Sequence, residues 1–262
     1  MRASWRIFFI GGMASYRALF TWLTPWILIP TFVLGPMFEL LFFAFVGKDA
    51  GVGDNTFYLI GNGISSAAVP CLFAMGNTIA NERYTQTLGL LLASPARRLP
   101  LFLGRALPVI LNGFCVAVVA LALGAVVLRV SLPVGAWAPI LGVTAVASFS
   151  CTGLGLVAAA IGLRVRETAT LSNIVLGVLL VFTGVNVAVA VLPPWMQSVS
   201  QVLPLTHGIE AARELAGGRS LADVAPLVRD EVVIGIVFAA IGFAMLLWME
   251  RESRRHASLE LA

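Results

Sequence analysis

Few residues in this chain have the type and spacing needed for catalysis. Gly63, Ile64 and Ser65 begin like the serine motif of intramembrane proteases, but Ser66 stands where that motif has glycine. The nearest candidate base, His207, falls in a separate and more polar segment. The chain has no HExxH sequence and no paired aspartates within an apolar run. We therefore expect no catalytic residue, and an intramembrane enzyme remains only as an alternative class.

The one lysine of the chain does not belong to a phosphate-binding loop. A Walker A loop requires GxxxxGK followed by serine or threonine. Lys48 follows Gly47, but Phe42 occupies the position of the first glycine. The sequence therefore predicts no ATP-binding site on this chain. Active transport would need a separate ATPase subunit.

Metal ligands are equally sparse. Cys71, Cys115 and Cys151 fall within apolar stretches and lack CxxC spacing. His207 has only Glu210 at ligand spacing. We therefore expect neither a metal site nor a cofactor, and we assign the cysteines to packing.

Two polar residues, Glu39 and His207, are candidates for a transport pathway or a subunit interface. Glu39 is the single acid within a predicted crossing, where burial costs about 2 to 3 kcal/mol unless a partner or water satisfies it. It could face the pathway or a subunit interface, or it could reach the outer interface and be merely tolerated there. For His207 a packing or hydrogen-bonding role is favoured.

The elements that must position these residues are membrane-spanning helices. A hydrophobic fraction of 59%, a charged fraction of 11% and a mean hydropathy of +0.95 exclude an ordinary water-soluble domain. Basic residues flank apolar runs instead of gathering on one polar face, which argues against a nucleic-acid partner. The runs are continuous, without the alternation of a membrane barrel. The predicted fold is all-α, a single membrane domain over residues 1–262 with six transmembrane helices near 26–46, 57–80, 103–128, 137–162, 170–192 and 232–249.

The basic residues also predict the orientation. Twelve of the 17 lysines and arginines fall in the N-terminal segment, the loops after the second and fourth spans, and the C-terminus. The positive-inside rule therefore places both termini in the cytoplasm. Residues 4–20 carry bulky side chains along one broad arc, which favours a helix lying in the membrane interface. The alternative is the first part of a long, tilted span.

The fourth predicted span contains a seam of small residues. Ala147, Cys151, Gly155 and Ala159 recur at every fourth position. Such a seam lets two helix backbones approach closely. The sequence leaves open whether the contact lies within the chain or between subunits.

Residues 193–230 are too polar to cross the membrane and precede the last span. Gly217 and Gly218 predict the end of a short helix that starts near Thr206. Ser220 with Asp223 resembles a capping box that opens another helix. The segment could be an ordinary external loop, or it could dip into the outer leaflet as a re-entrant element.

Residues 81–98 form an amphipathic segment on the predicted cytoplasmic side. Its apolar residues share one helical face, with polar flanks from Glu82, Arg83 and Gln86. Such a helix could dock a soluble partner or rest on lipid as a plain connector. The residues of the apolar face are Tyr84, Leu88, Leu91 and Leu92.

This segment resembles the coupling-helix region of ATP-binding-cassette (ABC) type-2 permeases, which read ER, a spacer, GTLE, and then LL before a small residue and proline. Gln86 and Gly89 depart from that pattern, and Gly89 removes the usual glutamate and any salt bridge it would make with an ATPase. The string PLTHGIEAAREL at 204–215 is also similar to the family. The matching residues are Glu82, Arg83, Thr87, Leu88, Leu91, Leu92, Ser94 and Pro95.

The resemblance implies a half-transporter. Two permease subunits, either copies or paralogues, would form the pathway in a bacterial inner membrane. Two cytoplasmic ATPase subunits carrying ATP and Mg would bind the coupling helices through Glu82, Arg83, Tyr84, Thr87, Leu88, Leu91 and Leu92. In this family residues 193–230 would be re-entrant external helices. The implied activity is export of a hydrophobic or amphipathic compound, with multidrug efflux first and lipid-linked glycan, polysaccharide or lipid export as the alternative. A non-transporting scaffold subunit is the remaining class.

Overall fold

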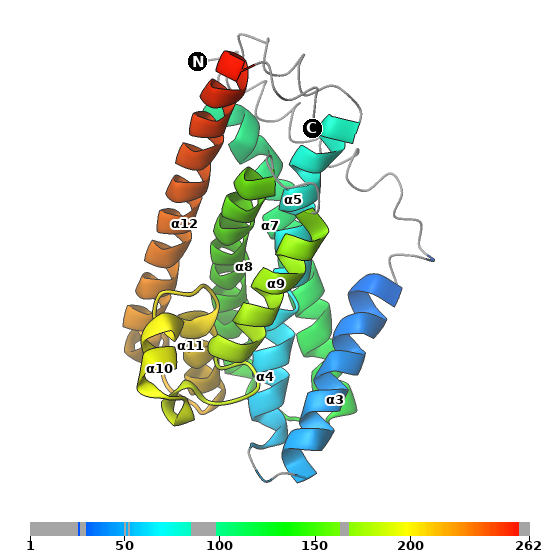
Figure 1. Ribbon diagram of the computed structural model, residues 1–262. Helices are drawn as coiled ribbons and strands as arrows, with labels where there is room; N and C mark the ends of the chain where they lie inside the picture. The colour runs from blue at the N-terminus through cyan, green and yellow to red at the C-terminus, as the bar shows by residue number, and fades with distance from the viewer. Residues whose placement is uncertain are drawn as a thin grey trace.

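The regular elements of the chain are helices that lie side by side in an elongated bundle (Figure 1). The computed structural model describes residues 26, 30–49, 51, 53–84, 98–162 and 168–256. Within these ranges no strand occurs, which confirms the all-α prediction. The predicted interfacial helix at 4–20 lies outside the described residues.

The elements follow one another in a simple order. They are η1 (Pro30–Leu34), α3 (Gly35–Asp49), α4 (Asn55–Ser65), α5 (Ala68–Tyr84), α7 (Arg98–Val127), α8 (Val134–Gly162), α9 (Thr168–Phe182), η2 (Val189–Val191), α10 (Pro194–Ser200), α11 (Thr206–Ala216) and α12 (Leu221–His256). Here η1 is a π-helical turn and η2 a 3-10 turn.

Helix α8 is the centre of the packing and contacts α5, α7, α9, α11 and α12. Its small-residue seam faces α5: a Cβ at Gly155 would lie 2.6 Å from the carbonyl oxygen of Cys71. Ala147, Cys151 and Ala159 on the same seam are fully buried. The seam therefore joins two helices of one chain, which resolves the choice left open by the sequence.

A second close approach joins α8 to α12. A Cβ at Gly153 would lie 2.7 Å from the carbonyl oxygen of Gly235, and one at Gly242 would lie 2.8 Å from the backbone nitrogen of Val157. Glycines on both helices thus allow backbone contact along a long stretch. α12 is thereby fixed along the central helix of the bundle.

Four helical stretches are long and apolar enough to cross a membrane: Asn55–Asn77, Gly104–Val127, Val134–Gly162 and Leu221–Met249. α9 has only 15 residues, below the roughly 20 needed for a perpendicular crossing, whereas α3 with its 15 residues directly continues the 5 residues of η1. Large apolar side chains are exposed along the bundle, as expected for contact with lipid. They include Phe38, Phe42 and Phe45 on α3, Ile174 and Val181 on α9, and Val233, Ile236 and Val237 on α12.

The predicted second span, 57–80, is interrupted by a turn at residues 66 and 67 between α4 and α5. Pro70 has no N–H to bond the carbonyl oxygen of Ser66, four residues earlier. The hydroxyls of Ser65 and Ser66 both donate to the carbonyl oxygen of Asn62, at 3.1 and 2.7 Å. A serine hydroxyl that donates to a carbonyl oxygen in the preceding turn can bend a helix. The Ser65 hydroxyl therefore takes part in a structural hydrogen bond.

The fifth and sixth predicted spans differ from the helices observed. The fifth, 170–192, ends ten residues early, because α9 stops at Phe182 and Gly184 follows with a φ of +77°. The sixth, 232–249, is part of α12, which already begins at Leu221. The last ten residues of the predicted external segment 193–230 therefore belong to the final helix.

Candidate functional site

The two ends of the bundle carry different elements. α10 and α11 lie at one end, with the connection between α3 and α4 (Figure 1). α5 ends, α7 begins and α12 finishes at the opposite end. The segment predicted to dock an ATPase therefore connects to the end away from α10 and α11.

Of the predicted docking residues, Glu82, Arg83 and Tyr84 form the last turn of α5. The other four, Thr87, Leu88, Leu91 and Leu92, lie outside the described residues. Their docking role stays a prediction. The structure adds that the segment begins directly from a helix packed against α8.

The α10–α11 pair is tied to the end of α9. The Ser200 hydroxyl donates to the carbonyl oxygen of Phe182, and the Phe182 ring meets the Trp195 ring edge-on at a centroid distance of 5.9 Å. The Gln197 side chain donates to the carbonyl oxygen of Leu192 at 2.8 Å. α10 thus lies across the end of the bundle and not along it (Figure 1).

The start of α11 is held by a side chain from another helix. Leu205 occupies the N-cap position, and a leucine side chain cannot accept the free N–H groups of a first turn. Glu231 of α12 supplies the acceptor: one carboxylate oxygen takes the Leu205 N–H at 2.7 Å, the other the Gly208 N–H at 3.1 Å. The Ser150 hydroxyl of α8 donates to the same carboxylate. Three helices therefore meet at one fully buried acid.

His207 lies between these two backbone contacts and is buried. Its Nε2 is 3.1 Å from the carbonyl oxygen of Gln201. Among the described residues its Nδ1 has no hydrogen-bond partner. No group of three or more metal-ligating side chains is found in that part of the chain. The Nε2 contact agrees with the hydrogen-bonding role favoured for His207, and its place at a pathway or subunit interface stays a prediction.

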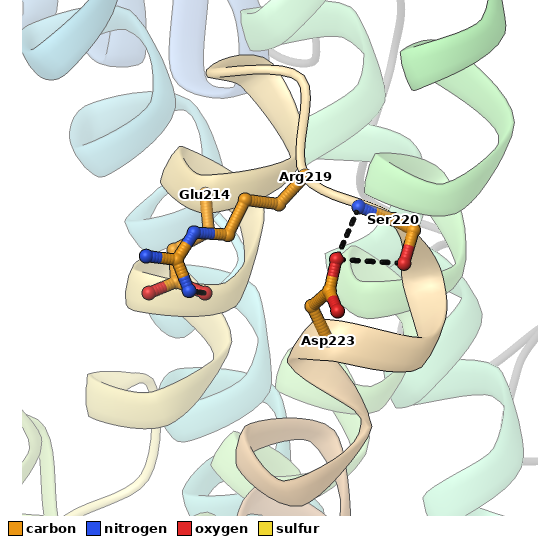
Figure 2. A network of polar contacts seen from close by, with 4 residues as sticks. All are labelled: Glu214, Arg219, Ser220 and Asp223. Carbon is orange, nitrogen blue, oxygen red and sulfur yellow. Dashed lines mark hydrogen bonds and ion pairs between the residues drawn. The ribbon is translucent and has the colours of Figure 1, made fainter.

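The end of α11 and the start of α12 follow the sequence prediction. Gly217 caps α11 and Gly218 takes a φ of +91°. Figure 2 shows the turn that follows, in which the Ser220 N–H and hydroxyl donate to the Asp223 carboxylate at 3.0 and 2.7 Å. The Arg219 guanidinium lies 3.7 Å from Glu214. One half of the predicted capping box is thus present, the bond from the Ser220 N–H to Asp223, and the helix it opens is α12 itself.

Arg213 of α11, which is half-buried, is the second ionisable anchor of this region. Its guanidinium donates to the carbonyl oxygens of Gly184 at 2.8 Å, Val185 at 2.9 Å and Phe57 at 3.2 Å. It also lies over the Phe57 ring, 3.5 Å from the centroid. One side chain thereby joins α11 to the start of α4 and to the segment after α9.

Burial lowers the pKa of Arg213 from the ordinary value of an arginine to about 10, and the nearby Glu210, Tyr58 and Asp54 oppose this shift. The guanidinium remains protonated at neutral pH because that pKa is still high. Its fixed charge is satisfied by carbonyl dipoles and an aromatic face. Arg213 therefore has a structural role, although the sequence placed it in the predicted external segment 193–230.

Glu39 is half-buried on α3, and no described residue forms a hydrogen bond or ion pair with it. The structure does not bring it together with His207. Among the polar residues at membrane depth, Asn62 donates to Asn186 at 3.1 Å, which links α4 to the segment after α9. Whether Glu39 borders a pathway or a partner subunit stays a prediction.

Sequence reasoning missed Glu231 because residue 231 fell between the predicted external segment and the last span. A signal was available: the string PLTH places leucine at the N-cap position, and the first turn of α11 contains no acid. A helix without its own cap needs an acceptor from elsewhere. Glu231 is the acid nearest to the last apolar run and was therefore the candidate for this acceptor.

The fold and these anchors define a polytopic helical membrane protein whose two ends carry separate elements. Residues 9–216 match the family described as ABC-2 type transporter, and the chain belongs to that family. It is a membrane-embedded permease of an ABC transporter, which implies partnership with an ABC ATPase subunit. α12 lies beyond the matched range. A search of the curated proteins finds no match.

Proposed function

We propose that this permease is the membrane subunit of an ATP-driven bacterial exporter. Two permease subunits form the pathway, and two ATPase subunits that carry ATP and Mg drive it from the cytoplasm. The cargo is a hydrophobic or amphipathic compound, and drug efflux is the first activity to test. Both chain termini lie on the cytoplasmic side of the inner membrane.

The separation of the two ends of the bundle carries this proposal. α5 ends at Tyr84 and α7 begins at Arg98 at the end away from α10 and α11 (Figure 1). The connecting segment is the one that resembles a coupling helix. An ATPase at this end would act on α5 and α7, and both helices pack against α8. The α10–α11 pair then borders the exit on the external side.

The docking segment is tested with the double substitution Leu88→Asp and Leu91→Asp. Two buried carboxylates in a docking face cost far more than the few apolar contacts removed, so we expect loss of the ATPase from the complex. The measurement is affinity purification of the tagged permease from its native membrane in mild detergent. The recovered ATPase is then quantified.

The matched control places the same two charges at the other end of the bundle. Val202 and Leu221 are 61% and 56% exposed there, and Val202→Asp with Leu221→Asp should leave ATPase recovery unchanged. Equal recovery with both double variants would refute the docking assignment. Absence of any Walker A protein from the wild-type preparation would instead favour the scaffold class.

A further inference from the structure

The structure assigns Glu231 a positioning role in transport: its carboxylate joins the first turn of α11 to α12, so that movement of α12 is passed to the α10–α11 pair. This inference rests on the proposed function, since it needs an ATPase whose action moves the bundle. It concerns a residue outside the segment matched by the family.

The contacts show that the first turn of α11 depends on this acid. The Leu205 and Gly208 N–H groups point at the two carboxylate oxygens, and the Leu205 side chain cannot replace either bond. Hydrogen bonds to a carboxylate are shorter and stronger than those between neutral groups. Glu231 is 0% exposed, so water does not compete for it. α11 and α12 are therefore joined at this point through polar bonds that have no substitute.

Packing keeps the two helices this close. A Cβ at Gly208 would lie 3.3 Å from the Cβ of Ala147 and 3.6 Å from the carboxylate carbon of Glu231. The glycine therefore brings the α11 backbone against both α8 and α12. Even a methyl group at this position would be tight against Ala147, so the close approach favours glycine.

The backbone next to this contact is held in a disfavoured conformation. Leu205 has a φ of +78°, a region that residues other than glycine seldom adopt. Its N–H is bound by Glu231, and its carbonyl oxygen accepts the first bond of α11 from Ile209 at 2.8 Å. Release of the carboxylate would let Leu205 return to an ordinary conformation. The turn before α11 is thus a hinge whose position Glu231 sets.

The helix that carries Glu231 reaches the other end of the bundle. α12 runs without interruption from Leu221 to His256, and no proline follows Pro226. It ends where α5 ends and α7 begins (Figure 1). Because a continuous helix moves as a stiff unit, a shift at its ATPase-proximal end also moves Glu231. The α10–α11 pair follows because its first turn is bonded to that residue.

The test measures hydrogen exchange of the permease–ATPase complex in lipid nanodiscs, without nucleotide and after trapping with ATP and vanadate. In the wild type, trapping should change exchange both in α12 and in peptides that cover Leu203–Ala216. In Glu231→Gln, the side-chain NH2 group replaces one carboxylate oxygen and cannot accept a hydrogen bond from a backbone N–H of α11. Basal hydrogen exchange of α11 should therefore rise about tenfold. The α12 response should persist, while the α11 response to trapping falls to about a tenth.

Asp230→Asn is the matched control, because it removes an exposed charge one residue away that pairs with Arg229 at 2.8 Å. It should behave like the wild type. A Glu231→Gln complex with an α11 response of wild-type size would overturn the positioning role. A wild type that binds no ATPase, or shows no response anywhere, would instead overturn the proposed function.

A second variant covers the case in which Glu231→Gln fails to assemble. Glu231→Asp keeps the charge but shortens the side chain by one carbon, so that the carboxylate no longer reaches both the Leu205 and the Gly208 N–H groups. We expect the α11 response to fall at least about twofold while the α12 response stays. A response equal to the wild type would then count against the positioning role.

Discussion

At the residue scale, Arg213 shows how a charged side chain can act as a structural centre beside a membrane bundle. Three carbonyl groups from two separate segments converge on its guanidinium, above an aromatic ring. Arginine suits this place because its planar fork presents several donors at fixed angles. A lysine at the same position would carry its three donors on one nitrogen and would lack the planar fork that reaches these carbonyl groups from two nitrogens.

We expect Arg213→Met to lower the free energy of unfolding in detergent by about 2 to 4 kcal/mol, because three carbonyl groups lose their donor. Arg213→Lys should cost about 1 to 2 kcal/mol. Arg219→Met is the control, since Arg219 is exposed and its contact with Glu214 is 3.7 Å long. Chemical denaturation followed by circular dichroism gives the comparison. Equal stability of the Arg213 and Arg219 variants would refute the anchoring role.

The destabilisation by Arg213→Met should not depend on pH between about pH 6 and about pH 9. The folded pKa of about 10 lies below the ordinary pKa of an arginine, so stability rises with pH only between these two pKa values. Below that window Arg213 is protonated in both the folded and the unfolded state. A difference that changed across the measured range would show that this group titrates at lower pH.

At the scale of the element, α8 determines how the bundle packs. Its two glycine-lined sides let α5 and α12 approach at backbone distance. Glycine within a helix costs about 1 kcal/mol relative to alanine when nothing else is affected. Glycines at these close contacts therefore serve packing rather than local helix stability.

Gly155→Ala should destabilise the permease by about 1 to 3 kcal/mol, because the new methyl group would lie 2.6 Å from the carbonyl oxygen of Cys71 and 3.2 Å from Met75. Gly142→Ala on the same helix is the matched control. Nothing lies within 4 Å of its added Cβ, so helix propensity alone should act and stability should stay equal or rise. Thermal unfolding in detergent distinguishes the two. A Gly155→Ala variant as stable as Gly142→Ala would exclude the tight α5–α8 contact.

The sequence predicted these elements unequally. Hydrophobic runs located most of the long helices but not their ends, and the signal at Gly217 placed the end of α11 correctly. Ser220 marked a helix start, although the sequence did not show that this helix continues into the last span. The end of α9 could not be read in the same way, because residues 183–192 are as apolar as the helix before them. Its stop depends on Gly184 and on carbonyl groups held by Arg213, which are contacts between distant parts of the chain. The anchors at Arg213 and Glu231 were missed for the same reason.

At the scale of the whole molecule, the structure predicts two chemically different ends on opposite sides of the membrane. The α10–α11 pair, with its capping turns and the two anchors Arg213 and Glu231, occupies one end (Figure 1). The connection that resembles a coupling helix starts at the other. The orientation follows from the basic residues and is open to direct test.

We expect a membrane-impermeant maleimide to label Val202→Cys in intact spheroplasts, because Val202 is 61% exposed beside α10. Ser253→Cys, in the last turns of α12, should react only after permeabilisation. Both variants are made in a Cys115→Ser background, since Cys115 is exposed while Cys71 and Cys151 are buried. The reverse labelling pattern would invert the orientation of the bundle.

The unbroken length of α12 also gives the molecule a lever. Its 36 residues span about 54 Å, whereas the hydrocarbon core of a bilayer is about 30 Å thick. About 24 Å of this rod therefore stands in the headgroup layers or in water. A rocking of about 10° around its midpoint would carry its two tips about 5 Å in opposite directions. A small change in the tilt of α12 within the bilayer would thus displace the chain at both membrane surfaces at the same time.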